Sequence, residues 1–184
     1  MTDIYFYGKD KKHSRDKTDM LIKKSLTDYA NRRGLEIPSE ARILRTEYAK
    51  PYVEKQGVFL GVTHTDDMLA VALGDADFGI DAENTERITE RYKSIAEKYY
   101  FGREKEYVFG TSRDKKTEFE RFLEIWVKKE AYLKCLGTGL SDIRRANTYE
   151  LCGRFEKVEA PCRIMYLYFP DEQANVSVSL HYND

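Results

Sequence analysis

The sequence has few of the features that would place it in a specialised class of protein. It contains three cysteines, Cys135, Cys152 and Cys162, and none of their spacings is typical of a metal site. We expect them to be reduced and mostly buried, as in a cytosolic protein. No apolar run approaches the roughly 20 residues of a membrane span, and the N-terminal segment has no apolar signal-peptide core. The sequence therefore predicts a cytoplasmic protein that does not associate with membranes.

A strong charge of either sign is also missing. The 31 lysines and arginines nearly balance the 32 aspartates and glutamates, which leaves a formal net charge of −1. This balance gives no global electrostatic reason to expect nucleic-acid or membrane binding. The N-terminal third is locally basic, and we interpret it either as a solvated helix face or as an anion-binding surface.

What the sequence does have is a substantial apolar fraction arranged in short periodic segments. At 184 residues and 41% hydrophobic residues, the chain can form one domain or two small lobes with a real core. Hydrophobic periodicity and turn signals predict a mixed α+β fold. We expect strands at 4–7, 41–47, 58–63, 68–73, 79–83, 148–152, 163–169 and 175–182, and helices at 15–33, 89–100, 103–109 and 117–136.

The predicted strand Gly79-Ile80-Asp81-Ala82-Glu83 carries two carboxylates. Because alternate residues of a strand share a face, Asp81 and Glu83 stand side by side with Gly79. We interpret the glycine as leaving room for a ligand beside the two acids.

A third carboxylate comes from the predicted helix that contains Trp126-Val127-Lys128-Lys129-Glu130-Ala131-Tyr132-Leu133-Lys134. Glu130 falls on the apolar stripe of this helix, where a charge is costly unless it is paired or binds a metal. Together with Asp81 and Glu83 it predicts a hard-cation site, Mg²⁺ with phosphate ligands. Lys134 lies one turn further on the same face and can reach the same phosphate. The alternative is an ordinary Glu–Lys helix pair.

These two stretches, in this order and at this spacing, resemble the paired signature of the 4′-phosphopantetheinyl transferases, G-[IV]-D-x-E and W-x-x-K-E-A-x-x-K. Two flanking segments strengthen the resemblance. Tyr48-Ala49-Lys50-Pro51 is similar to the family's G-K-P turn, and Val62-Thr63-His64-Thr65 is similar to its N-x-S-H-S strand, with Gly61 where Asn is usual. The resemblance extends from about residue 17 to residue 140.

The resemblance implies two similar α/β lobes in a pseudo-twofold arrangement, with the active site in the cleft between them. The N-terminal lobe would comprise residues 1–76, and the C-terminal lobe, residues 77–184, would carry the metal site. Because about 75 residues precede the Gly79 strand, the chain is more similar to the larger, single-chain class of the family than to the short trimeric class. That class modifies carrier proteins of secondary metabolism, and we expect a monomer.

The resemblance also implies an activity and a set of ligands. The enzyme would transfer 4′-phosphopantetheine from coenzyme A to a serine of an apo acyl carrier or peptidyl carrier protein, with Mg²⁺, and release 3′,5′-ADP. Asp81, Glu83 and Glu130 would hold the metal, and Lys134 would contact the coenzyme A phosphates. The residues that match the family's nucleotide-binding positions are Lys17, Thr18, Lys50, Thr63 and His64.

The general base is less clear, because the family's F-S-x-x-E motif is irregular here. Phe101 is followed at the expected position by Lys105 rather than by a glutamate. We favour Glu106, which precedes a tyrosine as the base does in some members, and Glu104 is the other option. The alternative is that both are solvated glutamates on a surface helix.

Two other functions are consistent with the sequence. A different Mg²⁺-dependent phosphoryl or pyrophosphate enzyme would keep the carboxylates without needing the Lys50-Pro51 turn or the Thr63-His64 strand. A non-catalytic carrier-protein binding module would have lost the base.

Overall fold

The computed structural model describes residues 1–8, 14–36, 41–54, 57–85, 90–110, 114–159, 163–171 and 177–183. The fold is mixed α/β and separates into two compact units. The first unit comprises Met1–Phe78 and Gln173–Asp184, and the second comprises Gly79–Glu172. Within the described segments, no helix is long and apolar enough to cross a membrane.

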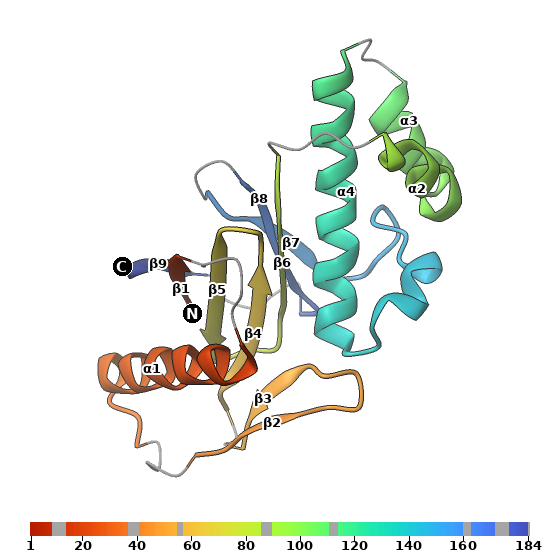
Figure 1. Ribbon diagram of the computed structural model, residues 1–184. Helices are drawn as coiled ribbons and strands as arrows, with labels where there is room; N and C mark the ends of the chain where they lie inside the picture. Colours follow the sequence, from red (N-terminus) through yellow and green to blue (C-terminus); the bar gives the residue numbers. More distant parts are fainter. Residues whose placement is uncertain are drawn as a thin grey trace. The chain divides into compact units, whose positions relative to one another are not determined.

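The first unit is built on a four-stranded sheet with the order β4-β5-β1-β9 (Figure 1). Its strands are β1 (Thr2–Gly8), β4 (Phe59–His64), β5 (Met68–Gly74) and β9 (Val178–Asn183). β1 runs antiparallel to β5 and parallel to β9. A two-stranded hairpin, β2 (Ile43–Arg45) and β3 (Pro51–Val53), belongs to the same unit.

One helix, α1 (Arg15–Arg33), packs on the sheet of the first unit. Its bounds follow from its caps. The Ser14 side chain accepts a hydrogen bond from the Lys17 N–H, and Gly34 ends the helix in the left-handed conformation at φ +60°. The core between helix and sheet is formed by tyrosines and branched aliphatic side chains: Tyr5, Tyr7, Leu21, Ile22, Leu26, Tyr29, Leu69, Val71 and Leu73.

The second unit contains a three-stranded antiparallel sheet and most of the helices. Its sheet has the order β6-β8-β7, from β6 (Gly79–Asn84), β7 (Arg154–Lys157) and β8 (Arg163–Phe169). The helices are α2 (Arg91–Tyr99), α3 (Gly102–Phe109) and α4 (Lys115–Leu136), followed by the 3₁₀ helix η1 (Leu140–Arg145).

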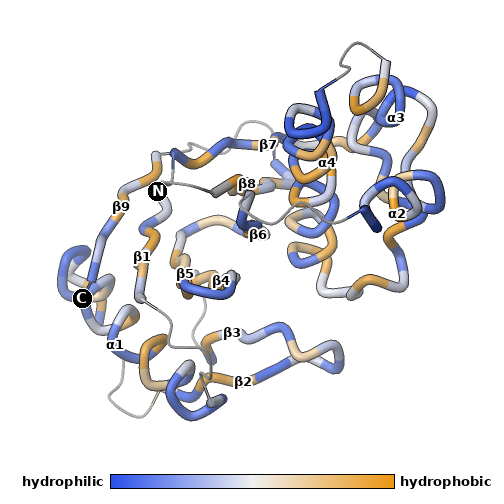
Figure 2. Tube along the Cα trace, turned by 45° about the horizontal axis from the view of Figure 1, so that its top comes forward, coloured by the Kyte–Doolittle hydropathy of each residue, from blue (hydrophilic) through white to orange (hydrophobic). Residues whose placement is uncertain are grey.

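The long helix α4 organises this unit. It contacts β6, β8, α2, α3 and η1, and apolar and hydrophilic segments alternate along it (Figure 2). The Asp114 side chain accepts hydrogen bonds from the N–H groups of Lys116 and Thr117, and Gly137 ends the helix at φ +69°. Beside α4 an aromatic core forms around Tyr92, in contact with Phe119 and Phe122.

Several sequence-based expectations differ from the structure. Residues 148–152 form turns rather than the expected strand. The strand in this part of the chain is β7, which begins later, at Arg154. The last strand, β9, was assigned to a C-terminal lobe of residues 77–184, yet it pairs with β1 in the first unit. Cys135 is buried as expected, but Cys152 is exposed. Cys162 lies outside the described residues.

Candidate functional site

The glycine of β6 allows a close approach between strand and helix. A Cβ atom at Gly79 would lie 1.9 Å from the carbonyl oxygen of Ala131 and 2.5 Å from the backbone nitrogen of Cys135. The space beside Gly79 is therefore filled by α4, which corrects the interpretation that it leaves room for a ligand. Asp81 and Glu83 share this face of β6. Asp81 is buried with 3% of its surface exposed, and Glu83 is half-buried.

Helix α4 brings Glu130 and Lys134 to the same place. The Lys134 Nζ lies 2.5 Å from Oδ1 of Asp81, so the strand and the helix are joined by an ion pair. Glu130, half-buried one turn earlier, forms a side-chain hydrogen bond with Trp126. Trp126 also stacks on Phe122 with ring centroids 6.1 Å apart, so this core residue orients the carboxylate.

The three carboxylates affect one another electrostatically. Burial raises the pKa of Glu130 to about 7, and the negative charges of Asp81 and Glu83 contribute to the rise. The positive charge of Lys134 and the hydrogen bond from Trp126 act in the opposite direction. Three carboxyl groups close together disfavour one another's ionised forms. A cation bound among them would reduce this repulsion, so the position favours a cation.

The chemistry of these side chains suits a hard divalent cation, since all three provide carboxylate oxygens. Their present arrangement does not form a coordination shell. Among the described residues, no three Asp, Glu, His or Cys side chains are placed so that they could hold a metal ion. The Mg²⁺ site at Asp81, Glu83 and Glu130 therefore stays a prediction.

Glu104 has a different environment from the one that a surface helix implies. It is fully buried at the start of α3, and its Oε2 lies 2.8 Å from Nζ of Lys129, which is also fully buried. The same oxygen accepts a hydrogen bond from the backbone N–H of Phe101, and Oε1 accepts from both the N–H and the hydroxyl of Thr148.

Sequence reasoning did not single out Lys129. Its place in the middle of a predicted amphipathic helix gave no sign of burial. The available signal was Glu104 itself, three residues after Phe101, since a glutamate at the third helical position often bonds back to the N-cap N–H. The other base candidate, Glu106, lies exposed on α3.

The first unit carries the residues that match nucleotide-binding positions. Lys17 and Thr18 lie in the first turn of α1, where Lys17 is exposed and the Thr18 N–H donates to the Ser14 carbonyl. A helix N-terminus of this kind favours an anion.

Thr63 and His64 lie at the end of β4. Thr63 is buried and His64 is exposed. The next residue, Thr65, closes the turn to β5, because its N–H donates to the Met68 carbonyl and its hydroxyl donates to Asp67. The short turn holds His64 at the edge of the sheet.

Lys50 precedes β3 in a tight turn. Its N–H donates to the Thr46 hydroxyl, and Ala49 adopts a left-handed conformation at φ +62°. The Lys50 Nζ lies 3.9 Å from Oδ1 of Asp77, and both residues line a cavity of about 380 Å³ together with Tyr52 and Phe59.

The carboxylates of the second unit lie in the part of the chain that a known family matches. Residues 77–179 match the 4′-phosphopantetheinyl transferase superfamily, and the chain belongs to it. Three similar proteins are 4′-phosphopantetheinyl transferases. The chain is 32% identical over 123 residues to gsp of Aneurinibacillus migulanus, covering 66% of this chain and 47% of the relative. It is 26% identical over 137 residues to Sfp of Bacillus subtilis (strain 168), covering 74% and 57%.

The third, psf-1 of Bacillus pumilus, is 28% identical over 134 residues, covering 68% of this chain and 55% of the relative. The chain thus spans about half the length of the curated relatives that it matches. The resemblance to Sfp-like transferases that the two short motifs indicated is confirmed.

Proposed function

We propose that this protein transfers 4′-phosphopantetheine from coenzyme A to a serine of an apo acyl carrier or peptidyl carrier protein. The observation that carries the proposal is the convergence of Asp81, Glu130 and Lys134 within the matched segment, with Glu83 on the same face of β6. The pyrophosphate of coenzyme A needs positive charge nearby. Lys134 provides one such charge, and the three carboxylates can hold a metal ion that provides another.

Asp81, Glu83 and Glu130 would hold Mg²⁺. Bound there, the ion would supply positive charge to the pyrophosphate and stabilise the charge that shifts onto the leaving group. The raised pKa of Glu130 supports this assignment, because a cation among the three acids would favour the ionised form that burial and the two neighbouring negative charges now disfavour.

Lys134 provides a second positive charge. Its side chain is 37% exposed although it pairs with the buried Asp81, so its ammonium group remains accessible from solvent. We assign it to the coenzyme A phosphates, where it would stabilise the 3′,5′-ADP leaving group.

Glu106 is the better candidate for the general base. Both oxygens of Glu104 are occupied inside the protein, and a base must reach the substrate hydroxyl within hydrogen-bond distance. In the proposed step, Glu106 takes the proton of the carrier serine, the serine oxygen bonds to the β-phosphorus, and the bond from that phosphorus to the bridging oxygen breaks. The electron pair stays with 3′,5′-ADP.

Lys17, Thr18, Lys50, Thr63 and His64 would bind the nucleotide end of coenzyme A. His64 and the first turn of α1 suit its 3′-phosphate, and Lys50 suits the nucleotide in the cavity beside β3. This assignment requires the two units to form pseudo-twofold lobes around a cleft. We place the chain in the larger class of the family, acting as a monomer on carriers of secondary metabolism.

Mass spectrometry of an apo carrier protein tests the reaction. The carrier is incubated with the protein, coenzyme A and Mg²⁺, and its mass is compared with that of a sample without the protein. A gain of one phosphopantetheine group supports the proposal. No gain across several acyl and peptidyl carriers, with the protein folded and coenzyme A bound, would contradict transfer and favour a binding module. Failure to bind coenzyme A would favour another Mg²⁺-dependent phosphoryl enzyme.

A further inference from the structure

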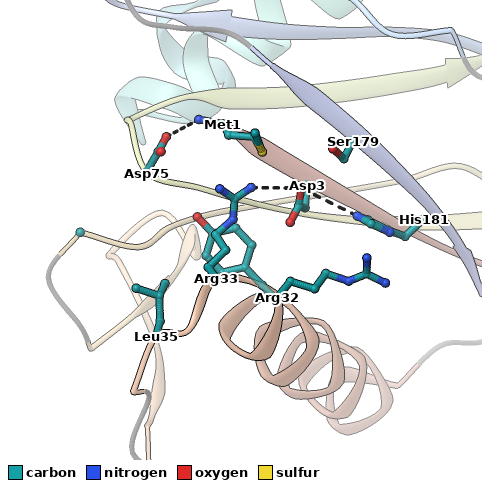
Figure 3. Close-up of a pocket in the computed structure, with 10 residues that line it drawn as sticks. Met1, Asp3, Arg32, Arg33, Leu35, Asp75, Ser179 and His181 are labelled. Carbon is teal, nitrogen blue, oxygen red and sulfur yellow. Dashed lines mark hydrogen bonds and ion pairs between the residues drawn. The ribbon is translucent and has the colours of Figure 1, made fainter.

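The first unit contains a second cavity, of about 620 Å³, beside the C-terminal end of α1 (Figure 3). β1 contributes Asp3, α1 contributes Arg32 and Arg33, and β9 contributes Ser179 and His181. The cavity therefore joins three elements that are distant in sequence, and cationic side chains and other hydrogen-bond donors are frequent on its walls.

Two of the side chains on its walls are held in place by aromatic rings. The guanidinium of Arg33 lies over the ring of Tyr29, 4.7 Å from its centroid, and the imidazole of His181 stacks on Tyr5 with centroids 4.7 Å apart. Both face the buried carboxylate of Asp3: Nη2 of Arg33 lies 3.2 Å from Oδ1, and Nε2 of His181 lies 3.8 Å from it. Donors fixed in this way lose little conformational entropy when a ligand binds.

The acids around the cavity are already compensated. Asp3 pairs with Arg33, Asp28 receives the Nε–H of Arg32 at 2.5 Å, and Asp75 contacts the amino group of Met1 at 2.5 Å. A guanidinium has five N–H donors, so these pairs leave donors on both arginines. The walls thus present hydrogen-bond donors without an excess of negative charge.

The cavity lies away from Lys17, Thr18, Thr63 and His64, four of the predicted nucleotide-binding residues, and it borders the cavity of Lys50 at Gly57. Arg32 and Lys17 are at opposite ends of α1, about 22 Å apart at 1.5 Å per residue. In the sheet, Asp3 pairs with Leu73 at one end of β5, whereas His64 pairs with Leu69 at the other end. A ligand in this cavity would not occupy the positions assigned to the 3′-phosphate of coenzyme A, the first turn of α1 and His64.

We propose that the cavity binds a small oxyanion, the phosphate or carboxylate group of a metabolite. Arg32 at the solvent side and Arg33 at the back would donate to its oxygens, since guanidinium groups match the geometry of phosphates and carboxylates. The Ser179 hydroxyl would complete the donor set. None of these residues is assigned a role in the transfer reaction, so the proposal stands or falls independently of it.

Nuclear magnetic resonance titration of the ¹⁵N-labelled full chain tests the proposal. Inorganic phosphate and acetate are added in separate titrations, with ionic strength held constant by NaCl because salt screens surface charges. We expect saturable shifts of the backbone amides of Asp3, Arg33, Ser179 and His181 with at least one probe. Saturation by phosphate alone identifies a phosphate ligand, and saturation by acetate alone identifies a carboxylate.

A matched pair of variants shows whether the cavity is responsible. Arg32→Gln removes the guanidinium at the rim and should raise the dissociation constant of the probe at least about fivefold. Arg42→Gln removes an exposed guanidinium that pairs with Glu54 outside this cavity, and should change it less than about twofold. Linear shifts, equal effects of the two variants, or shifts confined to residues 17, 18, 63 and 64 would overturn the proposal.

Discussion

Glu104 and Lys129 form an ion pair inside the second unit, with 2.8 Å between Oε2 and Nζ and neither side chain exposed. Lys129 also donates to the carbonyl of Ala146, and Glu104 accepts two hydrogen bonds from Thr148. The pair therefore joins α3, α4 and the segment after η1. Both carboxylate oxygens of Glu104 are therefore engaged inside the protein.

The first prediction concerns the energetics of this pair. Glu104→Gln should lower the free energy of unfolding by about 3 kcal/mol, because it leaves the buried ammonium of Lys129 without a counter-charge. Urea unfolding followed by circular dichroism measures the change. The double variant Glu104→Gln/Lys129→Met should recover most of the loss, since it removes both buried charges. A single variant as stable as the parent would show that the pair is unimportant for folding.

A second prediction tests the close contact between β6 and α4. Gly79→Ala should lower the melting temperature by at least about 5 °C, because its Cβ would overlap the Ala131 carbonyl. Gly102→Ala is the matched control, since nothing lies within 4 Å of a Cβ there, and it should leave the melting temperature unchanged or slightly higher. Equal melting temperatures for the two variants would be inconsistent with this packing.

The third prediction is a pH dependence. Glu124 on α4 accepts hydrogen bonds from Tyr107, Tyr166 and Lys128, at 2.7, 2.9 and 2.7 Å. Burial would raise the pKa of Glu124, but the hydrogen bonds from Lys128 and the two tyrosines outweigh it and the net shift is downward. Burial and the bond to Glu124 in turn raise the pKa of Tyr107 to about 12.

A carboxyl group with a lower pKa in the folded state stabilises the fold above its unfolded pKa, about 4.3. That contribution is lost as the pH falls through the folded value. Glu124→Gln should therefore cost about 1–2 kcal/mol at pH 7 and progressively less below pH 4. Unfolding of parent and variant at several pH values provides the comparison. A stability difference that grows on acidification would refute the assignment.

The fourth prediction concerns the proposed base. Glu106→Gln should reduce the turnover number about 10²-fold or more, because general-base catalysis typically contributes a factor of that size. Its melting temperature should not change, since the side chain is exposed. Glu97→Gln on α2 is the control, another exposed glutamate in the same unit, and it should retain activity. Loss of activity in Glu104→Gln alone, with that protein still folded, would transfer the role to Glu104.

Much of the local structure could be predicted because local signals determine it. The bounds of α1 follow from Ser14 and Gly34, and those of β8 follow from the run of mostly apolar residues after residue 162. The carboxylates of β6 and the position of Glu130 followed from periods of 2 and 3.6 residues. The structure places Asp81 and Lys134 in contact, and their shared ligand site stays a prediction.

The pairing of segments that are distant in sequence could not be predicted from local signals. Nothing local to β9 shows that it pairs with β1, more than 170 residues earlier in the chain. The burial of Lys129 depends on Glu104, and neither residue type predicts burial by itself. The turns at 148–152 also depend on a distant partner, since Thr148 is held by Glu104.

The central claim is that the acids of β6 and α4 hold the ion on which phosphopantetheine transfer depends. The most direct measurement is the transfer rate as a function of Mg²⁺ concentration for the parent and for Glu83→Gln, the more exposed of the two β6 acids. The account predicts no transfer in EDTA, and at least about a tenfold higher Mg²⁺ concentration for half-maximal rate in the variant. An identical Mg²⁺ dependence in both proteins, or undiminished transfer in EDTA, would contradict it.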